Sequence, residues 1–139
     1  MLMKNQLSWD RFFLGIAAKS AELSYEDKTK VGCIIVRDGN ILSFSYNGTP
    51  GGTSNIMRDS AGETLDIVLH AETNAIGKLA KSNESTERAT LYSTRAPCLD
   101  CAKTIYQSGI QRVVYSTDHS TDRGLLFLRN VGIHVLKVN

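Results

Sequence analysis

The sequence predicts an α/β protein in which helices cover a mixed five-stranded sheet. Two apolar runs joined by the turn pair Asp38-Gly39 predict an antiparallel hairpin in the first third of the chain. After residue 90, segments of strand length alternate with segments of helical period, which is typical of strands paired in parallel through crossover helices. The 139 residues fit one domain, which we expect to span residues 1–139.

Composition excludes several classes of protein. A hydrophobic content of 42% with 22% charged residues is ordinary for a globular chain and too apolar for a disordered one. A net charge of +2 lacks the concentrated positive field of a nucleic-acid binder, so we expect no nucleic-acid partner. No apolar run approaches the roughly 18 residues of a membrane span, so no membrane partner is expected. The N-terminus has no secretion-signal pattern and the cysteine count, 3, is odd, which together predict a cytoplasmic location.

The first half of the chain predicts one helix and two strands. Residues 8–23 have helical periodicity, with Ser8 as N-cap. We expect the aromatic side chains of this helix to lie in the core or at a subunit interface: Trp9, Phe12 and Phe13. Residues 31–36 predict an apolar strand and residues 41–46 its return strand. The following segment, 47–66, has little periodicity and predicts a long loop, which is often functional in a compact domain.

The second half predicts three helices and three strands. From His70 to Ala80 the apolar residues recur at helical spacing. Pro97 stands where the first residue of another helix is expected, and that helix would run to about Ser108. The remaining elements are strands at 91–94 and 113–115, a helix that includes 125–128, and a last strand at 133–138.

Two short motifs carry the strongest chemical signal: His70-Ala-Glu72 and Pro97-Cys98-Leu-Asp-Cys101. A spacing of three residues at a helix start places both sulfur atoms on one face. The positive end of the helix dipole also favours the thiolate form. His70 and Glu72 would diverge in mid-helix, so both can face one site only at the beginning of their helix. We therefore expect a site between two helix N-termini.

One imidazole and two thiolates make a set of three zinc ligands. A structural zinc normally has four protein ligands, whereas a catalytic zinc keeps one position for water. The third cysteine, Cys33, lies in an apolar strand and is interpreted as a core residue. The sequence thus predicts an open zinc site at His70, Cys98 and Cys101. Such a zinc lowers the pKa of its bound water toward about 7, and Glu72, beside it but not a ligand, would shuttle protons.

Further segments match a known family over nearly the whole chain. They include Lys30-Val31-Gly32-Cys33, Tyr46-Asn47-Gly48-Thr49-Pro50 and the residues Asn74-Ala75-Ile76 that follow the histidine motif. With these segments the chain resembles the deoxycytidylate (dCMP) deaminases of the cytidine-deaminase-like superfamily of zinc-dependent deaminases. The resemblance implies a three-layer α/β fold of that superfamily. It also implies hydrolytic deamination of dCMP to dUMP, which would supply thymidylate synthesis.

The resemblance implies a role for each matching site residue. His70, Cys98 and Cys101 would hold one Zn²⁺ per chain, and Glu72 would protonate N3 of the cytosine ring. The remaining substrate contacts would be the backbone N–H of Ala71 on the pyrimidine carbonyl, carbonyl groups near Arg95 and Ala96 on the exocyclic amine, Asn47 on a sugar hydroxyl, and Ser45 and Thr49 close to sugar or phosphate.

The same resemblance implies regulation and assembly. Members of the family commonly form hexamers, activated by dCTP and inhibited by dTTP. The effector site would use the Tyr46-Asn47-Gly48 segment, with Mg²⁺ beside the triphosphate, and Lys28 is a candidate cation for it. Where many relatives have Lys-Tyr this chain has Asp118-His119, and His119 is expected to be solvated.

Other functions remain open from the sequence. The same chemistry on dCTP or another cytosine nucleoside or nucleotide is the nearest alternative. A tRNA adenosine deaminase shares the metal motif but would need an RNA-binding surface. A thioredoxin-like redox protein would explain Cys98-x-x-Cys101 but not His70-Ala-Glu72. A zinc-binding nucleotide sensor without catalysis would have no use for Glu72.

Overall fold

The computed structural model describes residues 5–139. Its five strands form one mixed sheet in the order β2-β1-β3-β4-β5. β1 pairs antiparallel with β2 and β3, whereas β3, β4 and β5 run parallel to one another. In chain order the elements are α1 (Gln6–Ala21), β1 (Gly32–Arg37), β2 (Asn40–Tyr46), α2 (Ala71–Ala80), β3 (Thr90–Arg95), α3 (Leu99–Gln107), β4 (Arg112–Thr117), α4 (Arg123–Asn130) and β5 (His134–Lys137).

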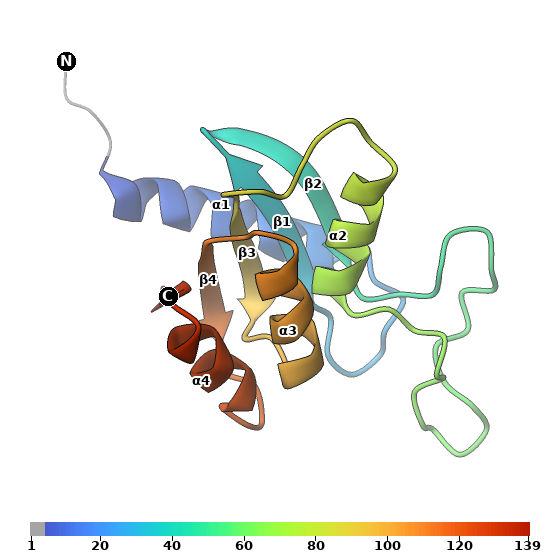
Figure 1. Cartoon of the computed structure of the whole chain (residues 1–139). Coiled ribbons are helices and arrows are strands. Elements are labelled where there is room, and N and C mark those ends of the chain that lie inside the picture. Colours follow the sequence, from blue (N-terminus) through green and yellow to red (C-terminus); the bar gives the residue numbers. More distant parts are fainter. Residues whose placement is uncertain (1–4) are drawn as a thin grey trace.

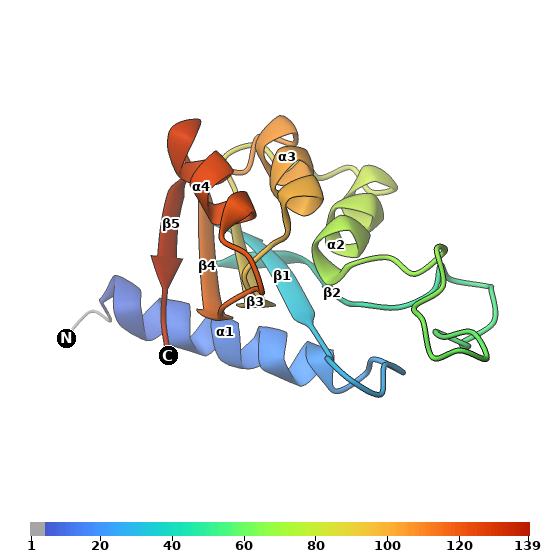
Figure 2. The ribbon, with the colours of Figure 1, turned by 90° about the horizontal axis from the view of Figure 1, so that it is seen from below.

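The helices cover the sheet on both faces and make three layers. Helix α1 crosses one face, and α2, α3 and α4 lie on the other (Figures 1 and 2). Side chains alternate along each strand, so neighbours such as Ile34 and Ile35 belong to different cores. The expected fold class, a five-stranded α/β sheet flanked by helices, is confirmed. Within the described residues no helix combines the length and the apolar character that crossing a membrane requires.

The start of α1 differs from the expected one. Asn5, not Ser8, is the N-cap, because the Asn5 side chain accepts a hydrogen bond of 2.9 Å from the Ser8 backbone N–H. Of the three aromatic residues near this end, only Phe13 is buried in the core. Trp9 and Phe12 are 45% and 55% exposed, so these two are not core residues, and their place at a subunit interface stays a prediction.

A buried polar network fastens α1 to the sheet. Asp10, fully buried, accepts hydrogen bonds from Tyr92 Oη at 2.6 Å and from Arg112 Nη1 and Nη2 at 2.8 and 2.6 Å. Burial alone would raise the pKa of Asp10, but the hydrogen bonds from Arg112, Tyr92 and Gln6 outweigh it and lower the pKa. The Asp10 carboxylate is therefore charged, and it joins α1 to an arginine of β4 that lies 102 residues away in the sequence.

Helix α1 also approaches β1 very closely. A Cβ atom added at Gly32 would lie 1.8 Å from the carbonyl oxygen of Ala17 and 2.6 Å from the backbone nitrogen of Ala21. Both contacts are with backbone, which cannot swing aside. A residue without a side chain is therefore required where β1 passes under the last turn of α1.

The contact at Gly32 predicts a large loss of stability on its replacement. Gly32→Ala should lower the free energy of unfolding by about 2–3 kcal/mol, because α1 must move away from the sheet. Gly15→Ala is the matched control, since nothing lies within 4 Å of the added atom and Gly15 is inside the same helix. It should raise stability by about 0.5–1 kcal/mol. Urea unfolding of both variants measures this, and equal effects would contradict the close approach.

The pairing of Asp10 predicts a pH-dependent contribution to stability. Asp10→Asn leaves Arg112 without its charge partner and should cost about 3–5 kcal/mol near neutral pH. The pKa of Asp10 is lower in the folded protein than its ordinary value of 3.8, so this contribution is complete above that value. It is lost as pH falls through the folded pKa. In urea unfolding the gap between wild type and variant should narrow below about pH 4, and a constant gap would refute the charge as its source.

Candidate active site

Two helices begin beside the carboxyl end of β3, and each begins with a residue of the chemical motifs. His70 is the N-cap of α2 and Cys98 is the N-cap of α3, both with extended backbone. The Cys98 sulfur accepts the backbone N–H of Cys101 at 3.5 Å, as an N-cap side chain does. Pro97 therefore precedes the N-cap, and the prediction that it is the first residue of the helix is wrong. Because both helices start here, His70 and Glu72 face the same site as the cysteines.

Of the described residues, His70, Cys98 and Cys101 bring potential metal-ligand atoms within 4.8 Å of one another. The Nδ1 atom of His70 lies 3.3 Å from the Cys101 sulfur and 3.6 Å from the Cys98 sulfur. Tetrahedral zinc with ordinary bond lengths places nitrogen and sulfur ligands about 3.5 Å apart. The donor set and its spacing therefore fit a zinc ion. Cys33 is fully buried in β1, as expected of a core residue.

The start of α4 supports the loop that carries Cys98. A Cβ atom added at Gly124 would lie 2.2 Å from the carbonyl oxygen of Pro97 and 2.9 Å from that of Cys98. The loop between β3 and α3 is thus held from behind by backbone contact. Hydrogen bonds from Cys101 and His70 lower the pKa of the Cys98 thiol, which favours the thiolate that a metal requires.

Glu72 is 4% exposed and lies beside the ligand group without being part of it. Its Oε1 atom is within hydrogen-bond distance, 3.1 Å, of the Ser93 hydroxyl on β3. Burial is the largest influence on this carboxyl group and raises its pKa. A carboxyl group that holds its proton more firmly than usual is suited to move protons near neutral pH.

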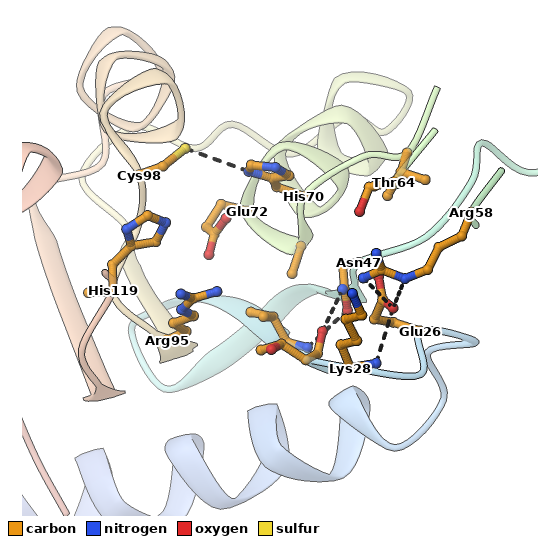
Figure 3. Close-up of a pocket in the computed structure, with 15 residues that line it drawn as sticks. Glu26, Lys28, Asn47, Arg58, Thr64, His70, Glu72, Arg95, Cys98 and His119 are labelled. Atoms are coloured by element: carbon orange, nitrogen blue, oxygen red, sulfur yellow. Dashed lines mark hydrogen bonds and ion pairs between the residues drawn. The ribbon is translucent and has the colours of Figure 1, made fainter. Parts of the chain in front are cut away.

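These groups open into a cavity of about 270 Å³ (Figure 3). His70, Cys98 and Glu72 form one wall, and the loops after α1 and β2 form the opposite wall. The lining residues are Glu26, Lys28, Thr29, Val31, Asn47, Arg58, Thr64, Val68, His70, Ala71, Glu72, Arg95, Ala96, Cys98 and His119.

The structure brings some of the expected substrate residues to the cavity and not others. Ala71, Arg95 and Ala96 line it, together with Asn47 and Lys28. The Asn47 side chain also holds the opposite wall together, accepting from the Val31 N–H and donating to the Thr29 carbonyl, each at 2.9 Å.

Two expected substrate residues and two expected effector residues lie outside the cavity lining. Ser45 is fully buried in β2, and Thr49 follows the strand without reaching the cavity. Tyr46 packs against α2, where its carbonyl accepts from Asn74 and its ring lies 5.8 Å from Lys78 Nζ. Gly48 pairs through its backbone with Leu69.

Sequence reasoning missed part of the lining. Glu26, Arg58 and Thr64 were not recognised, although Arg58 is the only basic residue of segment 47–66 and so offered a signal. His119 was expected to be solvated, but it is half-buried and faces the cavity. The backbone N–H of Thr121 donates to its Nδ1 atom at 3.2 Å, which leaves Nε2 as the nitrogen free to carry the proton.

Known proteins of similar sequence support a zinc site at these residues. Residues 7–117 match the cytidine and deoxycytidylate deaminase zinc-binding region. The chain is 38% identical over 121 residues to the deoxycytidylate deaminase of Mycobacterium phage D29, a match that covers 77% of this chain and 93% of the phage protein. It is 36% identical over 138 residues to that of Saccharomyces cerevisiae, with 92% of this chain and 44% of the yeast protein covered. The chain thus spans less than half the length of the yeast protein.

A solved structure is similar over the whole fold. The dCMP deaminase of the cyanophage S-TIM5, crystallised with dCMP and dUMP, superposes with a TM-score of 0.92 at 36% identity. The match covers 99% of this chain and 100% of the cyanophage chain. The matched segment 7–117 contains His70, Glu72, Cys98 and Cys101. By sequence, fold and site chemistry together, the chain belongs to the cytidine and deoxycytidylate deaminase zinc-binding family.

Proposed function

We propose that this protein is a zinc-dependent hydrolase that converts dCMP and water to dUMP and ammonia. The observation that carries the proposal is the meeting of a three-ligand group with a buried, non-ligating carboxyl group on one cavity wall. A structural zinc site would need a fourth protein ligand and would have no use for Glu72. The identity of the cyanophage ligands, dCMP and dUMP, supports the choice of substrate.

The chemistry follows from what each group can do. His70, Cys98 and Cys101 would hold zinc, which would supply a Lewis acid that makes water acidic enough to attack at neutral pH. Glu72 takes the proton that this water loses and delivers it to N3 of cytosine as the new C4–O bond forms. It then transfers the second water proton to the amino group, so that the C4–N bond breaks and ammonia leaves. The Ser93 hydroxyl keeps the carboxyl group aimed at these atoms.

The pyrimidine ring is oriented by backbone groups. Ala71 is the first residue of α2, and its N–H has no carbonyl partner within the helix. We assign it to the ring carbonyl of the substrate. The carbonyl groups of Arg95 and Ala96, at the end of β3, accept from the amino group that leaves. Asn47, with its amide already holding the opposite wall, has one further N–H for a sugar hydroxyl.

Unpaired cations favour a phosphorylated substrate over a nucleoside. Arg95 lines the cavity, half-buried, and its guanidinium has no acidic partner among residues 5–139. Lys28, more exposed, lines the other side, also without an ion pair in the described chain. The half-buried cation is the less screened of the two, so we assign the 5′-phosphate to Arg95.

Regulation, assembly and location remain predictions. Activation by dCTP, inhibition by dTTP, Mg²⁺ beside the effector, a hexamer, supply of thymidylate synthesis and a cytoplasmic location all follow from resemblance alone. Deamination of dCTP or of another cytosine nucleoside or nucleotide is the alternative within the same chemistry. The redox and sensor alternatives are less favoured, because His70 approaches both sulfurs and Glu72 lies beside the group.

A substrate panel tests the proposal. Purified protein loaded with zinc is incubated with deoxycytidine, dCMP and dCTP, each with and without dCTP–Mg²⁺ or dTTP, and ammonia release is measured. Turnover of dCMP well above the other two supports the proposal, and a response to the two triphosphates adds the regulation. Turnover of dCTP alone would replace the substrate, and no ammonia from a zinc-loaded protein would refute the activity.

Replacing Glu72 should separate catalysis from metal binding. Glu72→Gln keeps the size and the Ser93 contact but cannot exchange protons, so kcat for dCMP should fall by about 100- to 10,000-fold. Zinc content, measured by mass spectrometry of the metal, should stay near one ion per chain. Cys101→Ser is the control that should lose zinc. Loss of zinc from Glu72→Gln would contradict its assignment as a non-ligand.

Replacing Arg95 should affect the nucleotide and spare the nucleoside. Arg95→Gln keeps the backbone carbonyl but removes the charge, so KM for dCMP should rise about tenfold or more. Turnover of deoxycytidine, which we expect to be far weaker, should be unchanged, since that substrate has no phosphate. Lys28→Gln, at the exposed side of the cavity, is the comparison and should have the smaller effect on dCMP. Equal loss with both substrates would show that Arg95 does not bind the phosphate.

A further inference from the structure

The segment between β2 and α2 leaves the body of the molecule and returns to it at one point. The backbone of Gly48 and Leu69 forms two hydrogen bonds, of 3.1 and 2.8 Å, that close the base of the segment directly before His70. The segment extends away from the sheet and the helices (Figures 1 and 2). Within it, residues 57–65 form a small hairpin, in which Leu65 donates to Met57 at 2.8 Å and Asp59 to Glu63 at 2.9 Å.

One ion pair links this hairpin to the body. Arg58 donates from Nε to Glu26 Oε1 at 2.9 Å, and its Nη2 atom lies 2.8 Å from the same oxygen. Among residues 5–139, these are the polar side-chain contacts that segment 50–68 makes with the rest of the chain. Arg58 Nη1 also donates to the Gly62 carbonyl at 2.8 Å, so one guanidinium both closes the hairpin and binds it to the body. Figure 3 shows the contact of Arg58 with Glu26.

The Glu26 carboxylate is held in place to accept the hydrogen bonds of Arg58. Its side chain is only 5% exposed, and Oε1 also accepts the backbone N–H groups of Asp27 and Lys28 at 2.9 and 3.1 Å. Burial by itself would raise the pKa of Glu26, but the Lys28 N–H and Arg58 outweigh it and lower the pKa. The same carboxylate oxygen thus binds the backbone N–H groups of the turn beside the cavity and also the arginine of the hairpin.

The linked residues form the cavity wall that faces the catalytic groups. Arg58, Thr64 and Val68 come from the segment, whereas Glu26, Lys28 and Thr29 come from the turn after α1. In the described chain none of these residues forms a hydrogen bond or ion pair with the metal-ligand group, which lies on the starts of α2 and α3.

We propose that the Glu26–Arg58 pair positions the hairpin 57–65 against the cavity and thereby sets the affinity for the nucleotide. The inference rests on the proposed function. Glu26 acts through Arg58 and the Asp27–Lys28 backbone, so it is a positioning residue and not a catalytic one. Loss of the pair should release one wall and leave the chemistry on the other wall intact.

The test compares KM with kcat for dCMP in Glu26→Gln, Arg58→Gln and the double variant. Each single change should raise KM about tenfold and leave kcat within about twofold of wild type. Since the two side chains act as a unit, the double variant should raise KM no further than the single variants. Hydrogen exchange of residues 57–65, followed by mass spectrometry, should accelerate in all three. Arg58→Lys keeps the positive charge but loses the several N–H donors of the guanidinium. Its KM should therefore lie between those of wild type and Arg58→Gln.

The matched control is Glu84→Gln, which removes the carboxylate partner of Arg37, 2.8 Å away and remote from the cavity. It should leave KM and the exchange of residues 57–65 unchanged. The proposal is overturned if Glu26→Gln and Arg58→Gln lower the unfolding temperature with KM unchanged, because the pair is then merely structural. A fall in kcat at constant KM also overturns it. Absence of dCMP turnover in the wild type is a different result, since it refutes the proposed function itself.

Discussion

The site depends on one constraint: two helices must begin at the same place beside the end of β3. His70 and Cys98 are both N-cap residues, and at the two helix starts the Nδ1 atom of His70 lies 3.6 Å from the Cys98 sulfur. Parallel pairing of β3 with β4 fixes the loop that carries Cys98, and Gly124 allows α4 to press against that loop. Because the ligand atoms come from segments 28 residues apart, a change in any of these contacts would separate them.

Local patterns in the sequence predict the periodic elements and the ligand group well. The hairpin turn at Asp38-Gly39 has positive φ at both residues, as this residue pair favours, and the spacing of Cys98 and Cys101 already puts both on one side of a helix start. Long-range polar pairs cannot be predicted in this way. Glu26 and Arg58 are 32 residues apart and Asp10 and Arg112 are 102 apart, so no periodicity connects them. His119 looks like any polar loop residue until the fold brings its loop to the cavity.

The two walls of the cavity have different physical origins. The wall with His70, Glu72 and Cys98 stands on helix starts backed by the sheet, where backbone hydrogen bonds and a packed core keep positions constant. The other wall consists of turns held together by side chains: Asn47 grips the backbone at Thr29 and Val31, and Glu26 receives Arg58. The rigid wall suits bond making and breaking, which tolerates little misplacement. The turn-built wall can differ between relatives without disturbing that chemistry.

The closed base at Gly48 and Leu69 has a consequence for how such a chain can change in length. Residues 51–56, between this base and the hairpin, are all exposed. Doubling the length of a flexible loop costs only about 0.6 kcal/mol in closure entropy. Extra residues inserted there would project into solvent while the two backbone hydrogen bonds kept His70 in register. Residues 51–56 are therefore an insertion site. A recognition module could be added there in evolution, or a fluorescent reporter by engineering, without a change at the metal ligands.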